Sequence, residues 1–203
     1  MVVLLFGLLT LADRLGAFAA ERVVAQRIQV DQLLAVRPDV TIDGIPFLTQ
    51  LAGGHYERVD VTVRDLRRGS LDISGVMAHL YGVDVPFTDV VHQRVDRIVV
   101  DRATGEVDLN YADVNQVLSG KHLELSDGAG GQVHVTASAG PAAVDGDFPL
   151  TVRGSSLDIQ LPAGISVQIP LPRLPFGITL TSARAGGNGI VVRCATSGFI
   201  LRR

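Results

Sequence analysis

The chain has 203 residues, of which 47% are hydrophobic and 19% are charged, and its formal net charge is −3. This composition excludes intrinsic disorder, which needs low hydrophobicity and high net charge, and the lack of a basic excess argues against a nucleic-acid partner. A single cysteine, Cys194, excludes an internal disulfide and a multi-cysteine metal site.

The N-terminal segment is the first informative stretch. Residues 2–12 form an uncharged and almost wholly apolar run, shorter than the about 20 residues that cross a bilayer. The run fits the apolar part of a signal peptide, and Ala-Phe-Ala at residues 17–19 offers a cleavage pattern. No basic residue precedes it, so an uncleaved membrane anchor and a buried core helix stay open as alternatives. We expect residues 1–20 to be a signal peptide or anchor and residues 21–203 to form a single domain.

A long helix is predicted next. From Leu15 onward, apolar residues recur at spacings of three and four, which is typical of an amphipathic helix. The pattern fades after Leu34 and is closed by Pro38. A helix this long usually lies across another element, and we expect a sheet.

Beyond Pro38 the period changes to two, which indicates strands. The clearest half-buried strand covers residues 59–63. A phase change at Gly75 predicts a bulge, and residues 95–109 are expected to form a hairpin with its turn at 103–105. The other expected elements are short helices at 47–51 and 111–118 and strands at 40–42, 71–73, 76–80, 123–125, 133–137, 150–152, 157–161, 165–169, 178–181 and 190–194. Because strands follow one another through short turns, the pattern predicts an antiparallel sheet and an α+β fold.

The search for chemistry gives no catalytic constellation. There is no nucleophile elbow, no zinc-protease motif and no phosphate-binding loop. None of the five histidines pairs with a carboxylate or a second histidine at ligand spacing on a helix, so a surface or satisfied-core role is favoured for each. Cys194 shares a strand face with Ile190 and Val192, which predicts a buried, inert thiol. We therefore expect no enzyme activity, no cofactor and no metal.

The apolar content is almost entirely aliphatic, and this leaves two interpretations. Aliphatic strands can enclose a groove for acyl chains, because burying each methylene contributes about 0.8 kcal/mol without any polar motif. The same strands can simply form a solid core. Composition alone does not separate the two.

Several stretches resemble signatures of a known family. The first is residues 40–51, Val-Thr-Ile-Asp-Gly-Ile-Pro-Phe-Leu-Thr-Gln-Leu, and the second is residues 174–180, Leu-Pro-Phe-Gly-Ile-Thr-Leu, followed by Gly-Ile-Val-Val. Ala-Asp-Arg at residues 12–14, Ala-Glu-Arg at 20–22 and the run from 107 to 115 add to the similarity. Together they resemble the LmeA-like phospholipid-binding family of actinobacterial cell envelopes.

The resemblance implies a fold similar to the tubular lipid-binding (TULIP-like) modules, in which a long helix packs on the concave face of a strongly curved antiparallel sheet. It implies an exported or membrane-attached protein that binds phospholipids, inositol lipids included, without catalysis, at the outer side of the cytoplasmic membrane, and supports envelope lipid or lipoglycan assembly. The alternatives are an envelope scaffold that binds a protein partner through a sheet edge, or an enzyme of envelope lipid or glycan metabolism.

Two sets of residues are candidates for the binding site. Apolar residues that can face the interior between helix and sheet are expected to line a groove, although each can equally belong to the core. They are Phe18, Val24, Ile28, Phe47, Leu51, Val59, Val61, Val63 and Phe176. Arginines near a strand end suit a phosphate headgroup, because the planar guanidinium binds phosphate through two hydrogen bonds; they are Arg64, Arg67, Arg68 and Arg173. Arg173 lies in the proline-rich segment 170–175, which is expected to be extended at a sheet edge.

Overall fold

A computed structural model describes residues 2–68, 71–92, 95, 97–137, 143–171 and 178–202. The chain forms two compact units. Unit 1 comprises residues 1–63, 77–104 and 196–203, and unit 2 comprises residues 64–76 and 105–195. The division into residues 1–20 and a single domain over 21–203 stays a prediction.

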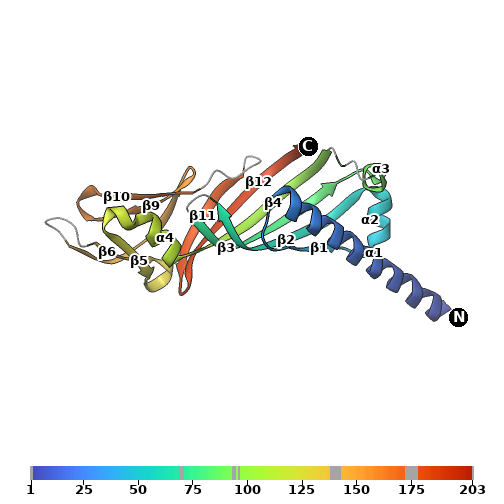
Figure 1. Ribbon diagram of the computed structural model, residues 1–203, viewed down its shortest axis with the longest axis horizontal. Helices are drawn as coiled ribbons and strands as arrows, with labels where there is room; N and C mark the ends of the chain where they lie inside the picture. Colours follow the sequence, from blue (N-terminus) through green and yellow to red (C-terminus); the bar gives the residue numbers. More distant parts are fainter. Residues whose placement is uncertain are drawn as a thin grey trace. The chain divides into compact units, whose positions relative to one another are not determined.

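The largest element is a six-stranded antiparallel sheet with the order β1-β2-β3-β4-β12-β11 (Figure 1). Its strands are β1 (Asp39–Asp43), β2 (His55–Arg68), β3 (Leu71–Asp84), β4 (Arg97–Asn110), β11 (Thr179–Gly186) and β12 (Gly189–Arg202). The sheet and the N-terminal helix confirm the predicted α+β class. The sheet is not strongly curled, so the expected strong curvature is wrong. Most of its buried apolar residues belong to two separate clusters, one in each unit.

The predicted hairpin over residues 95–109 is also wrong, because β4 runs through its expected turn without a break. Ala103 is only 5% exposed, and Gly105 is buried as well. The small residues that suggested a turn therefore lie inside the strand, at the point where β4 passes from unit 1 to unit 2.

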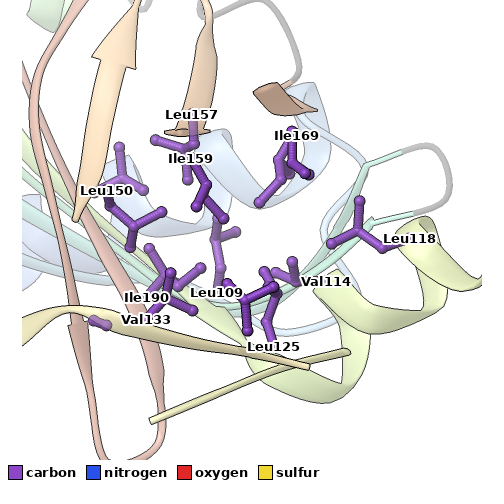
Figure 2. Close-up of a cluster of buried hydrophobic side chains, with 14 of the residues drawn as sticks. Leu109, Val114, Leu118, Leu125, Val133, Leu150, Leu157, Ile159, Ile169 and Ile190 are labelled. Atoms are coloured by element: carbon purple, nitrogen blue, oxygen red, sulfur yellow. The ribbon is translucent and has the colours of Figure 1, made fainter. Parts of the chain in front are cut away.

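Unit 2 closes around a continuous apolar core (Figure 2). Two three-stranded antiparallel sheets and helix α4 (Tyr111–Leu118) contribute to it together with residues of the large sheet. Leu125 and Val133 come from the first small sheet, and Leu157 and Ile159 from the second; all four side chains are at most 1% exposed. The strands are β5 (Leu123–Asp127), β6 (Val133–Ala137) and β7 (Val144–Phe148), and β10 (Ser166–Pro170), β9 (Ser156–Gln160) and β8 (Leu150–Arg153). Pro170 ends the edge strand β10, as its missing N–H predicts; residues 172–177 lie outside the described residues.

Helix α4 has the predicted bounds, and two asparagines explain its position. The Asn110 side chain caps the helix by accepting a hydrogen bond from the Ala112 N–H at 3.1 Å. Asn115 accepts from the Leu125 N–H at 2.8 Å and donates to the Leu125 carbonyl at 2.9 Å. Its amide thus pairs with β5 much as a neighbouring strand would, and α4 is fixed against the sheet.

Unit 1 contains three helices among its described residues: α1 (Val2–Asp31), α2 (Phe47–Gly53) and α3 (Phe87–Val91). Helix α2 confirms the predicted short helix, and Gly54 ends it with φ +68°, a left-handed conformation that glycine adopts without strain. Helix α1 begins earlier than the sequence pattern suggested. Within the described residues, none of the helices has the length and apolar character needed to traverse a lipid bilayer.

Two carboxylates attach α1 to the rest of unit 1. The buried Asp13 accepts a hydrogen bond from the Leu48 N–H, in the first turn of α2, at 2.8 Å. That bond, with one from Arg14, lowers the pKa of Asp13 below its ordinary value. About two turns further along α1, Glu21 accepts from the Ile42 N–H at 2.9 Å. Ile42 belongs to β1, the edge strand of the sheet, so α1 satisfies backbone groups that the edge leaves unpaired.

His134 pairs with two carboxylates on the small sheet β5-β6-β7. Its Nδ1–H donates to Asp147 at 2.7 Å, and its Nε2 lies 3.0 Å from Asp145. The hydrogen bond to Asp147 raises the pKa of His134 above its ordinary 6.5. The same bond lowers the pKa of Asp147 below its ordinary 3.8.

The first prediction concerns Asp13. Replacing it with alanine (Asp13→Ala) removes the acceptor of the Leu48 N–H, which has no partner inside its own helix. We expect amide hydrogen exchange at Leu48 to accelerate about tenfold or more, as the loss of a hydrogen bond to a charged acceptor implies. Asp31→Ala, on the same helix but exposed, is the matched control and should leave that rate unchanged. Equal exchange rates at Leu48 in the wild type and Asp13→Ala would contradict the docking role.

The second prediction concerns pH. The stabilisation from His134 is complete below about pH 6.5 and is lost as the pH rises through its raised folded-state pKa, whereas that from Asp147 is present above about pH 4 and is lost as the pH falls through its lowered pKa. His134→Gln should therefore destabilise the protein most between about pH 4 and 6.5. Urea midpoints measured within this range and on both sides of it, from about pH 3 to about pH 9, give the difference, with His122→Asn as the control. A difference that does not vary with pH would refute the pairing.

Candidate functional site

Exposed apolar side chains gather in one unit. Among the described residues, every large hydrophobic side chain that is exposed belongs to unit 1, except Ile165. They come from α1, α2, α3, the connecting segments and two long strands, β3 and β12: Phe6, Leu8, Leu9, Leu11, Leu15, Phe18, Val23, Val24, Val30, Leu33, Val36, Ile45, Leu48, Met77, Phe87 and Ile200. A concentration of exposed apolar surface indicates an interaction site. Unit 1 is therefore the candidate functional unit, whereas unit 2 has closed its core.

A row of valines on β2 continues this apolar surface. Val59, Val61 and Val63 alternate with polar residues and so share one face of the sheet. Val59 pairs with Ile42 and Val61 with Val40 on β1, and both β1 residues are buried on the same face. The three valines are only half-buried, so the row offers apolar surface that the protein itself does not fully cover.

The structure brings some of the predicted groove residues together. Phe47, Leu51 and Val59 pack in one cluster, in which Phe47 is 1% exposed and its ring centroid lies 6.4 Å from that of Tyr56. Ile28 is half-buried on α1.

Two other predicted groove residues stand apart from this cluster. Phe18 and Val24 are exposed on α1, and the Arg22 guanidinium lies 4.2 Å from the Phe18 ring. Phe176 lies outside the described residues.

The predicted headgroup arginines follow the valine row along β2. Arg64 is exposed, and alternation directs it to the face opposite Val63. Arg67 and Arg68 form the end of β2, but their side chains lie outside the described part of the chain, as does the whole of Arg173.

The opposite face of the sheet carries a polar network that the sequence did not predict. Arg58 holds Asp60 through two hydrogen bonds of 2.7 and 2.6 Å, and His79 on β3 donates to Asp60 at 2.8 Å. Burial pushes the pKa of Asp60 upward, but the bonds from Arg58 and His79 outweigh it, so the pKa lies below its ordinary value. Arg58 and Arg102 both lie over the Tyr81 ring, at 5.7 and 4.5 Å from its centroid.

These polar groups bind one another across β2, β3 and β4, and the network joins strands instead of exposing a reactive group. His55 likewise pairs with Asp84 at 2.6 Å. Arg58 and Asp60 are two residues apart on β2, but sequence spacing could not reveal the pairs of His79 with Asp60 and of His55 with Asp84, because each joins different strands whose register only the fold defines. The described residues contain no group of three or more His, Cys, Asp or Glu side chains placed to hold a metal ion. Cys194 is buried as predicted, and burial raises the pKa of its thiol.

Comparison with known proteins completes the description of the site. No curated protein and no solved structure matches the chain, so kinship with the tubular lipid-binding modules stays a prediction. Residues 11–195 match the family model described as LmeA-like phospholipid-binding. The match includes both α1 from Leu11 onward and the valine row. The chain therefore belongs to the LmeA-like phospholipid-binding family.

Proposed function

We propose that this protein binds a phospholipid, inositol phospholipids included, on the apolar surface of unit 1, without catalysing a reaction. The observation that carries the proposal is the half-buried valine row of a chain that belongs to a phospholipid-binding family. The acyl chains would lie against Val59, Val61 and Val63.

The geometry of the row suits an extended hydrocarbon chain. Alternate residues on a strand are about 6.6 Å apart, so the three valines provide a continuous apolar strip of about 13 Å. Each methylene that leaves water on such a strip contributes about 0.8 kcal/mol. Binding by area in this way needs no polar motif, which agrees with the lack of a catalytic motif in the sequence.

The distribution of polar groups supports binding without catalysis. Arg58, Asp60 and Thr62 lie on the sheet face opposite the valine row, by the alternation of β2. Asp60 is already engaged by Arg58 and His79, so no carboxylate or imidazole of this network faces the proposed lipid.

The proposal includes a location and a role. We infer that the protein is exported and acts at the outer side of the cytoplasmic membrane, attached there by its apolar N-terminal segment, in support of envelope lipid or lipoglycan assembly. The uncharged run over residues 2–12 supports this location, and the net charge of −3 supports a partner other than nucleic acid.

The third prediction tests the valine row. The double variant Val61→Thr/Val63→Thr keeps the shape and β-branching of both side chains but makes the strip polar. We expect the affinity for phospholipid to fall about fivefold or more, because apolar contact is lost on both residues. Native mass spectrometry of the purified protein with a lipid extract measures the bound fraction.

Val152→Thr is the matched control, because Val152 is a half-buried strand valine of unit 2. It should leave lipid binding unchanged. If both variants bind as the wild type does, the row is ordinary core. Copurification of a protein in place of lipid would favour the scaffold alternative, and turnover of the added lipids would favour an enzyme.

The fourth prediction tests the headgroup arginines. Arg67→Ser/Arg68→Ser should weaken binding to anionic vesicles, and the loss should shrink at moderate salt, because arginines near an anionic surface contribute about 1 kcal/mol each. Vesicle sedimentation with phosphatidylglycerol measures the effect, and phosphatidylcholine vesicles are the control. Unchanged binding to the anionic vesicles at every salt concentration would remove Arg67 and Arg68 from the site.

A further inference from the structure

The outer face of helix α1 carries an apolar stripe. Leu8, Leu11, Leu15 and Phe18 follow one another at spacings of three, four and three residues, so they lie on one face of the helix. Each is between 51% and 63% exposed. We call these four residues the outer stripe; it extends over about 15 Å of the helix axis.

The outer stripe points away from the rest of unit 1. At about 100° per residue, Asp13 and Ala17 lie on the side of α1 opposite the stripe, and both are buried. Asp13 holds that side against α2 through its bond to the Leu48 N–H. The stripe is therefore a second apolar face, distinct from the one that packs on the protein. The first turns of α1 extend past α2 (Figure 1), and there Phe6 and Leu9 are exposed on the other side of the helix as well.

Charges on α1 are sorted between the two faces. Both acidic groups near the stripe turn inward, where Asp13 bonds to Leu48 and Glu21 bonds to Ile42. Two exposed cations lie beside the stripe: Arg14, which pairs with Asp13, and Arg22, whose guanidinium lies over the ring of Phe18. The outer face of α1 thus combines apolar side chains with cations beside them, which complements an anionic lipid surface.

The geometry points to a membrane surface as the occupant of the outer stripe, with α1 lying in the plane of the interface. This inference rests on the proposed function and adds the orientation of the helix and the residues that enter the lipid. The stripe enters the acyl region, while the opposite face of α1 stays bonded to the protein.

The width of the apolar face favours a lipid surface over a second copy of the chain. Ala12 and Ala19 flank the stripe and are exposed, so the apolar arc covers about a third of the helix circumference. A helix–helix seam needs a narrower stripe bordered by charged pairs. Here the arc continues into the uncharged residues 2–12.

The inference also requires that α1 is kept in the mature protein. Cleavage after Ala19 would remove the stripe together with Asp13 and Ala17, which belong to the fold of unit 1. The intact mass of protein purified from a cell-envelope fraction tests this requirement. A mature chain that lacks residues 1–19 would overturn the inference.

The chain has no tryptophan, so single substitutions provide a clean probe of depth. Leu8→Trp and Leu15→Trp report on the stripe, and Asp31→Trp is the matched control, because Asp31 is exposed on the side of α1 opposite the stripe. With vesicles of phosphatidylcholine and phosphatidylglycerol, we expect both stripe variants to show blue-shifted emission and equal quenching by lipids brominated at a shallow position. Asp31→Trp should show neither.

Three results would overturn the inference. Quenching that places the indole of the Leu8→Trp variant deeper than that of the Leu15→Trp variant, by up to about 10 Å, would indicate a helix inserted end-on. No spectral change in either variant would exclude contact with lipid. Self-association in the absence of vesicles, reversed by Leu15→Glu and not by Val30→Glu, would assign the stripe to a second copy.

Different measurements test this inference and the proposed function, so either one can fail alone. Native mass spectrometry reports on phospholipid held by the valine row, whereas tryptophan depth reports on the outer stripe. Leu11→Glu/Leu15→Glu should abolish vesicle docking and leave the lipid bound in the mass spectrum. Loss of bound lipid in Val61→Thr/Val63→Thr with intact docking would be the reverse pattern.

Discussion

Two inward-facing carboxylates determine how unit 1 is built. Helix α1 carries large apolar side chains on more than one side, so hydrophobic contact alone would allow it more than one orientation. Asp13 and Glu21 remove this freedom, because each accepts a hydrogen bond from a specific backbone N–H, that of Leu48 and that of Ile42. Bonds to charged acceptors are among the stronger ones in proteins, and they are directional. The rotation of α1 about its axis is thereby fixed.

This fixed rotation decides which surfaces remain open. With Ala17 and Ala25 buried, the large side chains of α1 are left outside, and the small residues allow the helix to approach closely. The edge strand β1 is protected at the same time, because its Ile42 N–H is paired. In unit 2, by contrast, the two small sheets and α4 pack around one buried core. Unit 2 thus buries nearly all of its described large apolar side chains, whereas unit 1 keeps many of its own exposed.

The sequence predicted the local elements in which apolar residues recur at a regular spacing. Alternating valines predicted β2, and the bounds of α4 followed from its apolar spacing and the glycine after it. The hairpin at 95–109 failed because small residues such as Gly105 also occur where a long strand passes between two packed clusters. Within the candidate site, the valine row was predicted from the alternation of apolar and polar residues along β2. The roles of Asp13 and Glu21 and the network around Asp60 were not, since each depends on contacts between elements distant in sequence.

Four long strands belong to both units, because β2, β3, β4 and β12 each begin in one and end in the other. Neither unit is thus a continuous stretch of sequence, and no single peptide bond can be cut to separate them. During synthesis, unit 1 has to wait for residues 196–203 before its last strand is available, although α1 was made first. Helix α1 can pack on α2 and β1 as soon as these are made, whereas unit 1 is completed only by contacts of very long sequence separation.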